Sequence, residues 1–194
     1  LVATYDARAN GKLTLDQAVE LTDDDKVPGS GILTQHFSGG LKLPLRDVLR
    51  LMIVYSDNTA TNLVAEQIGL GRTAALMEEI GLPNTKLHAM VYRGDTSIFP
   101  ERSKLYGLGS TTAREMVDLL ERLDRGQIVS PEACQTMIEM LQACDDRTML
   151  VRDLPPGTRV AHKSGAVAVS RTDAGLIDSP SGRIAVCVLT TDNE

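Results

Sequence analysis

The sequence predicts an α+β protein in which a long helical block is followed by a short antiparallel sheet. Apolar residues recur at helical spacing in several segments of residues 1–150. The pattern becomes extended after Pro155-Pro156-Gly157, and Ser179-Pro180-Ser181-Gly182 supplies a turn of the kind that joins neighbouring strands. We therefore expect a two-layer fold, with a helical region over residues 1–150 and a partial antiparallel sheet of three strands over residues 151–194.

The first elements are predicted from their start and stop signals. Residues 1–10 have the pattern of a helix that ends at Asn10-Gly11. Residues 14–21 begin with a Thr that has Gln three residues later, which is the capping-box pattern of a short helix. Residues 22–42 combine an acidic cluster with several glycines, which predicts a surface loop anchored by the apolar pair Ile32-Leu33.

The middle of the chain predicts three helices and a long loop. The helices share a stripe of apolar residues at helical spacing, and they cover Leu45 to Tyr55, Thr59 to Ile68 and Arg72 to Ile80. Residues 84–110 have no regular period. A loop of this length inside a compact domain is usually functional or mobile.

The last predicted elements are two helices and three strands. Either Thr111 or Thr112 caps a helix over residues 113–123. Ser130-Pro131 begins the next helix, because Ser suits the N-cap and Pro suits the first helical position. The strands are expected over residues 158–163, 171–177 and 183–191.

Composition excludes several classes of function. The chain is 42% hydrophobic and 24% charged, which is ordinary for a globular protein, and no apolar run is long enough to span a bilayer. The net charge of -6 argues against non-specific binding to nucleic acid. Aromatic residues reach only 3%, so stacking platforms for single strands are absent too. No signal segment is visible at the start of the sequence.

The cysteines and histidines predict no metal site. Cys134, Cys144 and Cys187 form no CxxC pair and have no zinc spacing, so we interpret them as small buried hydrophobic residues. The first two are expected on one helix, roughly 15 Å apart and too distant for a disulfide. The three histidines have no sequence partners that suggest a triad or a metal site, and we expect structural or surface roles for His36, His88 and His162.

Two short motifs carry the chemistry, Ser56-Asp57-Asn58 and Lys163-Ser164-Gly165. The first lies between two predicted helices, where Ser, Asp and Asn suit a junction and an N-cap better than a helix interior. The plain interpretation is a helix cap. The functional interpretation is one wall of an active site, because a junction between buried helices holds polar side chains rigidly. The second motif falls on the first predicted strand.

Together and in this order, the motifs resemble those of the penicillin-recognising serine hydrolases, and most closely the class A β-lactamase-like branch. The resemblance extends to residues 29–33, 43–63, 110–120 and 162–165 and so touches most of the chain. It implies a β-lactamase/transpeptidase-like fold and a reaction through an acyl-serine intermediate. It also implies no cofactor and no metal. The implied partner is a small-molecule β-lactam or a D-Ala-D-Ala-like peptide, and the implied location is secreted, periplasmic or the cell envelope.

The resemblance also implies catalytic roles. Ser56 would relay a proton to the departing amine, and Lys163 would offer positive charge to the substrate carboxylate and hold Ser56 in place. The backbone N–H of Ala166 would contribute to the oxyanion hole.

Further residues are expected to bind substrate or support the site. Asn58 would hydrogen-bond the amide side chain of the substrate, and Ser164 would add a hydroxyl contact. Gly165 would let a ligand approach the strand edge closely. Arg171 is a weaker candidate for the substrate carboxylate. Asp57 is expected to brace the junction through backbone N–H groups.

The sequence departs from the family pattern in two places. No Ser has Lys three residues later, so the Ser-x-x-Lys nucleophile motif is absent. We expect it upstream of Leu1, with the chain truncated at both ends and inactive alone. No Glu has Asn four residues later, and the loop over 84–110 contains only the acids Asp95 and Glu101. The identity of the deacylation base is therefore open.

Three functions share the same recognition groups. The first is an acyl-serine hydrolase that opens the amide bond of β-lactams. The second is a D-alanyl-D-alanine carboxypeptidase or esterase-like enzyme. The third is a β-lactam-binding module that is acylated and does not turn over. They differ in the fate of the acyl-enzyme.

Overall fold

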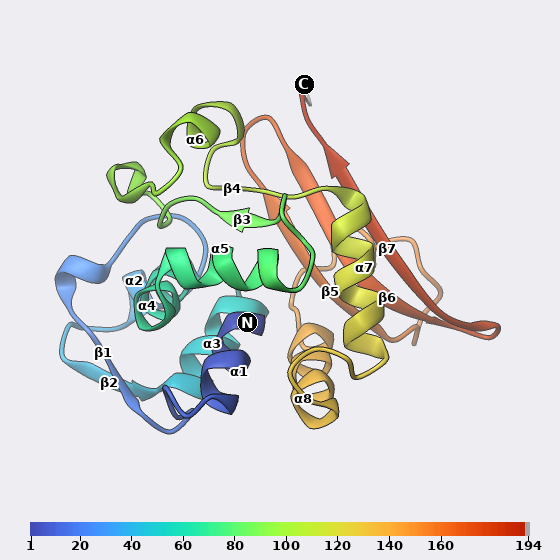
Figure 1. Cartoon of the computed structure of the whole chain (residues 1–194), viewed down its shortest axis with the longest axis horizontal. Helices are drawn as coiled ribbons and strands as arrows, with labels where there is room; N and C mark the ends of the chain where they lie inside the picture. The colour runs from blue at the N-terminus through green and yellow to red at the C-terminus, as the bar shows by residue number, and fades with distance from the viewer. Residues whose placement is uncertain (193–194) are drawn as a thin grey trace. The chain divides into compact units, whose positions relative to one another are not determined.

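The computed structural model describes residues 1–192 and divides into two compact units, Leu1–Thr111 and Thr112–Glu194 (Figure 1). The boundary between the units lies after Thr111, whereas the sequence pattern changes from helical to extended near residue 150. Two helices after Thr112 belong with the sheet, because they cover it. Of the predicted sheet region over 151–194, Asn193 and Glu194 lie outside the described residues.

The first unit is built on four helices that enclose an aliphatic core. Helix α3 packs against α4, and α1 contacts both α4 and α5. Among its wholly buried side chains are Leu33, Leu45, Val48 and Leu49. The helices are α1 (Val2–Ala9), α3 (Leu45–Val54), α4 (Asn58–Ile68) and α5 (Leu70–Glu79), close to the predicted bounds.

The predicted helix over residues 14–21 is wrong, because this segment forms strand β1 (Ala18–Leu21). It pairs antiparallel with β2 (Leu41–Pro44), with Leu21 opposite Leu41. Half of the capping box is present, since the Thr14 N–H donates to Gln17 Oε1 at 3.0 Å. The tertiary partner decides the outcome, because strand pairing turns the alternate residues Val19 and Leu21 into the core.

The predicted loops contain short elements that lack a sequence period. Between β1 and β2 lie a single 3₁₀ turn, Asp23–Asp25, and the short helix α2 (Leu33–His36). The segment 84–110 contains β3 (Lys86–Leu87) paired with β4 (Gly109–Ser110), and between them a 3₁₀ turn at Gly94–Thr96 and helix α6 (Pro100–Tyr106). Helix α6 buries none of its residues, so it has no apolar face that the sequence could reveal.

The second unit is a three-stranded antiparallel sheet covered by two helices. Strand order is β5-β6-β7, so β5 is an edge strand. Helix α8 contacts β5, whereas α7 contacts β6 and β7. Each helix begins with the predicted cap, since Thr112 and Ser130 accept a hydrogen bond from the N–H three residues later. The elements are α7 (Ala113–Asp124), α8 (Pro131–Gln142), β5 (Val160–Ala166), β6 (Arg171–Ser179) and β7 (Gly182–Thr190).

The cysteines depart from the prediction in two details. Cys144 lies beyond the end of α8 and so does not share a helix with Cys134. Both are buried free thiols, whereas Cys187 on β7 is only half-buried. The helix ends early because Ala143 closes it with backbone hydrogen bonds to the last turn.

Candidate active site

The Ser56-Asp57-Asn58 junction is a tight turn between α3 and α4. Tyr55 ends α3, and Asp57 is the N-cap of α4. Ser56 between them has φ 53°, a left-handed conformation that is uncommon for a residue with a side chain. A strained residue of this kind persists only where its surroundings over-determine it.

Asp57 is the group that fixes this turn. Its Oδ1 accepts the Ala60 N–H at 2.8 Å, and its Oδ2 accepts the N–H groups of Ile32 and Leu33 at 2.7 and 2.9 Å. The side chain is 1% exposed. A buried carboxylate with three backbone donors is fully engaged, and these are the contacts that the predicted bracing role requires.

The loop Pro28-Gly29-Ser30-Gly31 wraps the junction, and sequence reasoning did not assign it this function. The Ser30 hydroxyl donates to the Ser56 carbonyl at 2.7 Å, and the Asn58 N–H donates to the Ser30 carbonyl at 3.0 Å. The Asn58 side-chain amide donates to the Pro28 carbonyl at 2.9 Å. A Cβ on Gly31 would lie 2.3 Å from the Asp57 carboxyl, so only glycine permits this approach.

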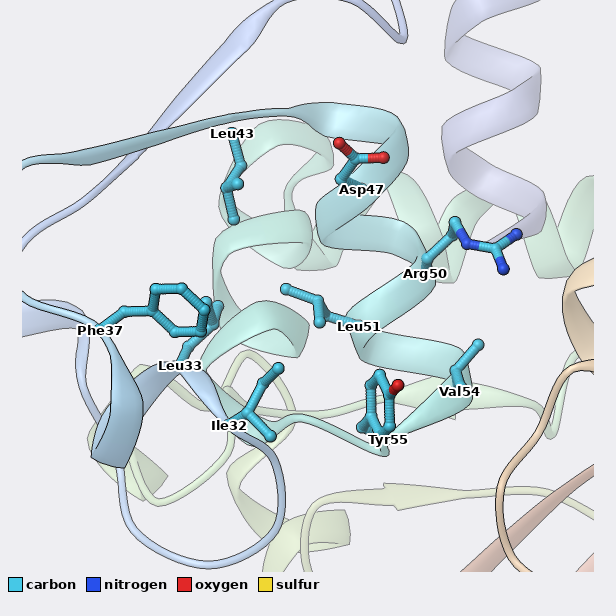
Figure 2. Close-up of a pocket in the computed structure, with 9 residues that line it drawn as sticks. All are labelled: Ile32, Leu33, Phe37, Leu43, Asp47, Arg50, Leu51, Val54 and Tyr55. Atoms are coloured by element: carbon cyan, nitrogen blue, oxygen red, sulfur yellow. The ribbon is translucent and has the colours of Figure 1, made fainter.

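A surface pocket adjoins the same junction (Figure 2). Its volume is about 310 Å³, and it is mostly apolar, with Tyr55 at one end and Phe37 at the other. None of Ser56, Asp57 and Asn58 lines it. Because the motif does not line this pocket, we take the junction, and not the pocket, as the candidate active site of this unit. The remaining lining residues are Ile32, Leu33, Leu43, Asp47, Arg50, Leu51 and Val54.

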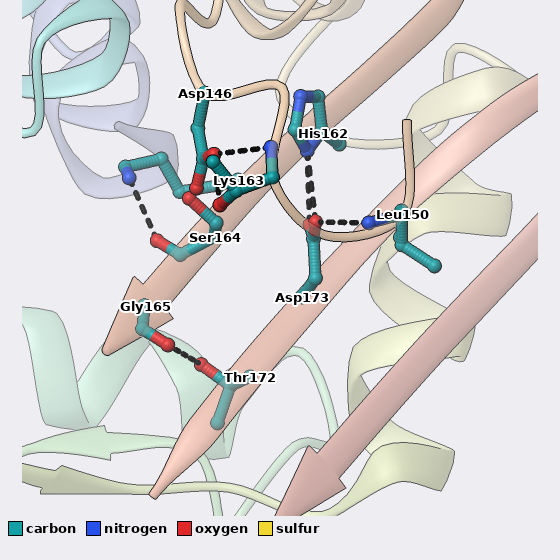
Figure 3. Close-up of polar contacts among 9 residues, drawn as sticks. Asp146, Leu150, His162, Lys163, Ser164, Gly165, Thr172 and Asp173 are labelled. Carbon is teal, nitrogen blue, oxygen red and sulfur yellow. Dashed lines mark hydrogen bonds and ion pairs between the residues drawn. The ribbon is translucent and has the colours of Figure 1, made fainter. Parts of the chain in front are cut away.

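In the second unit, Lys163-Ser164-Gly165 lies on the edge strand β5 (Figure 3). The Lys163 ammonium donates to the Ser164 carbonyl at 2.7 Å. Burial lowers the pKa of Lys163 from its ordinary value, and the nearby Cys144 and the carboxylates of Asp146 and Asp173 oppose that shift. A partly buried ammonium on a strand edge can attract a carboxylate more strongly than a fully hydrated one.

The other predicted residues of this strand have internal partners. A Cβ on Gly165 would lie 2.7 Å from the Thr172 hydroxyl, so this glycine also makes room for the neighbouring strand. Ala166 lies opposite Arg171 in the β5–β6 register. The Arg171 guanidinium donates to the Val167 and Ser170 carbonyls of the turn between these strands.

A buried polar cluster lies on the Ser164 side of the sheet, and sequence reasoning missed it (Figure 3). His162 is 0% exposed and donates through Nδ1 to Asp173 at 3.0 Å. Asp173 also accepts the Leu150 N–H at 3.1 Å, which ties the segment before β5 to β6. In the β5–β6 register Asp173 lies directly opposite Ser164, so the His162–Asp173 pair is next to a predicted substrate-binding residue. The signal that could have found this pair is the alternation of side chains along two neighbouring strands. His162 lies two residues before Ser164, and Asp173 lies opposite Ser164, so His162 and Asp173 are on the same face of the sheet.

The cluster has unusual proton affinities. Burial alone would lower the pKa of His162, but the hydrogen bond to Asp173 and the neighbouring Cys144 thiol raise it to about 9. Its Nε2 has no partner with hydrogen-bond geometry among the described residues, so Asp173 is the dominant contact. Burial opposes the charge on Asp146, yet the Ser164 hydroxyl and the Thr148 donors lower the pKa of Asp146 to about 2.

The structure thus places the predicted residues in two groups, each within one unit. Ser56, Asp57 and Asn58 form one turn, and Lys163 to Ala166 with Arg171 form one strand pair. Within residues 1–192, no three His, Cys, Asp or Glu side chains are arranged to hold a metal ion. No helix in that range is long and apolar enough to cross a membrane.

Comparison with known proteins gives a consistent result. Residues 1–194 match the sequence model of the beta-lactamase enzyme family. The chain is 27% identical over 190 residues to a β-lactamase of Bacillus licheniformis, covering 93% of this chain and 57% of that protein. The chain therefore spans less than two thirds of the length of this relative.

Solved structures give the same match in three dimensions. A β-lactamase from Sphaerobacter thermophilus has a TM-score of 0.86 and 30% identity, over 98% of this chain and 70% of that one. PBP-A has a TM-score of 0.84 and 26% identity, over 99% and 68%. A mutant of PBP-A, solved as an acyl-enzyme complex with penicillin G, gives the same score and identity over 100% and 70%.

Proposed function

This chain belongs to the beta-lactamase enzyme family, and we propose that it provides the substrate-recognition side of a serine hydrolase that opens β-lactam amides. The family and the β-lactamase/transpeptidase-like α+β fold agree with the sequence prediction. We assign the activity to the full-length protein, in which a Ser-x-x-Lys motif of the family would supply the nucleophile. The family also favours a secreted or periplasmic location for it.

The observation that carries the proposal is the clamped, left-handed conformation of Ser56. Its carbonyl accepts the Ser30 hydroxyl, and the next residue is held by three backbone donors. Strain of this kind is maintained where a hydroxyl must be presented in one direction. In acylation, the nucleophile hydroxyl gives up its proton as its oxygen bonds the carbonyl carbon, the C–N bond breaks, and the nitrogen takes a proton. We assign a relay role to the Ser56 hydroxyl, which gives its proton to the nitrogen and regains the proton that the nucleophile gave up.

The β5 edge supports the binding half of the proposal. An edge strand offers unpaired backbone groups to an extended ligand, and Gly165 adds no side chain to block its approach. Lys163 supplies positive charge for a substrate carboxylate, with Ser164 beside it and Arg171 as the weaker alternative. We assign one oxyanion donor to the Ala166 N–H.

A second candidate function is supported by the loop over residues 84–110. Hydrolysis of an acyl-enzyme needs a base to activate water, and this loop contributes only exposed carboxylates. Glu101 is paired with Lys104 on α6, and Asp95 lies on an exposed 3₁₀ turn. Slow deacylation of the β-lactam adduct would make the protein a penicillin-binding module, or a D-alanyl-D-alanine carboxypeptidase if it still hydrolyses the acyl-enzyme formed from its peptide substrate. A penicillin acyl-enzyme has been captured in a mutant of the neighbour PBP-A.

Kinetics of the full-length protein with a chromogenic cephalosporin separate these functions. A β-lactamase should show sustained turnover. A burst of one product per protein with no steady state would favour the binding module, and release of D-Ala from a peptide would favour the carboxypeptidase. Absence of any acylation would refute the proposed function.

Lys163 is the residue whose removal tests the site most directly. We expect Lys163→Ala to lower the acylation rate by at least about 100-fold, because a charge that anchors the substrate is lost. The matched control is Lys104→Ala, since that side chain is 69% exposed and forms a surface salt bridge with Glu101. Wild-type acylation by Lys163→Ala would refute the assigned role. The measurement is stopped-flow acylation with the same cephalosporin.

A further inference from the structure

We propose that Tyr92 is a specificity-determining residue that forms an aromatic wall beside Asn58 and selects substrates with an aryl group on the amide side chain. This inference rests on the proposed function and adds a substrate class to it. Sequence reasoning assigned no role to Tyr92, which lies in the loop between β3 and α6 (Figure 1).

Tyr92 has a backbone conformation that its side chain disfavours. Its φ is 58°, in the left-handed region, where a bulky residue is a genuine outlier. The side chain is nevertheless 67% exposed, so the strain is not compensated by burial in the core. Strained residues of this kind are found at ligand clamps and active sites, where the surroundings impose them.

The chain on both sides of Tyr92 is held by hydrogen bonds. Asn62, which is 2% exposed on α4, accepts the Val91 N–H at 2.7 Å and donates to the Val91 carbonyl at 3.0 Å. On the other side, the Arg93 guanidinium donates to the Asp24 carbonyl, and the Arg93 N–H donates to Met90 at 3.1 Å. The turn is therefore fixed from two directions, which sets the point on the backbone from which the Tyr92 side chain projects.

The hydroxyl end of the Tyr92 side chain lies beside the same glycine as Asn58, a predicted substrate-binding residue. A Cβ on Gly29 would lie 3.3 Å from the Tyr92 hydroxyl and 2.5 Å from the Asn58 amide nitrogen. Both side chains therefore flank the same glycine, and the absence of a side chain at residue 29 leaves room for both of them there. Because Asn62 is one helical turn after Asn58, the same helix positions the amide and the loop that carries the ring.

The Asn58 amide and the Tyr92 ring together have the chemistry needed to bind the acyl side chain of a substrate. One of the two N–H bonds of the Asn58 amide is engaged by Pro28, so its second N–H can donate to the carbonyl of an acylamino group. The Tyr92 ring can then pack against an aryl group attached to that carbonyl, in an edge-to-face or offset-stacked arrangement. The expected substrates are penicillins or related amides with an aromatic acyl side chain.

The test compares acylation of the full-length protein by benzylpenicillin and by 6-aminopenicillanic acid, which lacks the aryl acyl group. In Tyr92→Gly we expect the ratio of the two rate constants to fall about 10-fold, while Tyr92→Phe keeps it within about twofold. Glycine adopts positive φ without strain, so Tyr92→Gly should not lower the melting temperature. Tyr106→Ala is the matched control, since that ring is 60% exposed on α6.

The possible outcomes are separable. A Tyr92→Gly protein that keeps the wild-type ratio would overturn the inference and leave the proposed function intact. An equal loss of both rates together with a lower melting temperature would assign Tyr92 a purely structural role and also overturn it. If the wild-type protein is acylated by neither compound, the proposed function fails and the inference fails with it.

Discussion

At the scale of single residues, Asp57 illustrates how one carboxylate organises the junction that we assign to the active site. It accepts one N–H from its own helix and two from the segment that begins α2. Without it, the turn that contains the left-handed Ser56 would lose three of the hydrogen bonds that join it to α4 and to the start of α2. Asp57 thus helps to set the direction of Ser56, the residue that we propose acts on substrate.

Asp57→Ala tests this role. Three N–H groups would lose their acceptor, two of them buried and one of these the N-cap bond of α4, so we expect a destabilisation of about 3 kcal/mol or more. Urea unfolding measures it. Asp24→Ala is the control, because its side chain is exposed in the same unit. Equal unfolding free energies for the two variants would contradict the bracing role.

His162 is a second residue whose environment has a measurable consequence. Its ordinary pKa of 6.5 is raised to about 9 in the folded protein, with Asp173 as the partner that overcomes burial. A group with a raised folded pKa binds its proton more tightly when folded. Its stabilising contribution is therefore complete below about pH 6.5 and is lost as the pH rises through about 9.

We expect the unfolding free energy of the wild-type protein to fall over this alkaline range more steeply than that of His162→Gln. Gln cannot titrate, so the part of the slope that belongs to residue 162 should vanish. Asp173→Asn should also flatten the slope, because it removes the partner that raises the pKa. Urea unfolding at a series of pH values measures both. Parallel curves for all three proteins would show that the pair does not stabilise the folded state in this way.

At the scale of elements, the pairing of β5 with β6 depends on two glycines that differ in what surrounds them. A Cβ on Gly175 would lie 2.6 Å from both the Ala161 carbonyl and the His162 Cβ. A Cβ on Gly165 would meet only the Thr172 hydroxyl, at 2.7 Å. The first contact is with a fixed strand, whereas the second is with the end of a side chain that can rotate.

Substitution of Gly175 should therefore mainly lower stability, whereas substitution of Gly165 should mainly slow acylation. We expect Gly175→Ala to destabilise the protein by about 3 kcal/mol, because the strands must move apart, and Gly165→Ala by less than about 1 kcal/mol. Gly165→Ala should instead slow acylation, since the added methyl group lies on the edge that a ligand approaches. Thermal unfolding and stopped-flow acylation measure the two effects. A stable Gly175→Ala protein would contradict the packing argument.

The helices show which elements a sequence can specify. Helices α3, α4, α7 and α8 have a buried apolar face and a recognisable start, and their predicted bounds agree with the structure to within a few residues. Strand β1 and helix α6 were not predicted from the sequence. The first takes its form from pairing with β2, and the second has no buried face at all.

At the scale of the whole molecule, two compact units carry one motif each. The first holds the Ser56 junction together with the loops that clamp it, and the second holds the Lys163 strand together with the His162–Asp173 pair. The chain has a net charge of -6 and a pI of about 5.1, so the anionic substrate that we propose would be recognised by local cations such as Lys163 rather than by the overall charge.

The sequence by itself determined the α+β fold class and, through the resemblance of its two motifs to those of a known family, the family. Helix caps and apolar periods are local patterns, and local patterns are set by neighbours along the chain. The sequence also predicted the residues of the candidate site, with Asp57 as a brace because Asp suits an N-cap.

Only the tertiary structure decided how these residues are held. The loop at Gly29 to Gly31, the Asn62 clamp on Val91 and the His162–Asp173 pair each join residues that lie 11 to 29 positions apart. No local pattern records such a contact, because a buried hydrogen bond depends on which distant group the fold delivers to it. The strained φ angles of Ser56 and Tyr92 follow from those contacts, and a sequence of ordinary Ser and Tyr residues gives no sign of them.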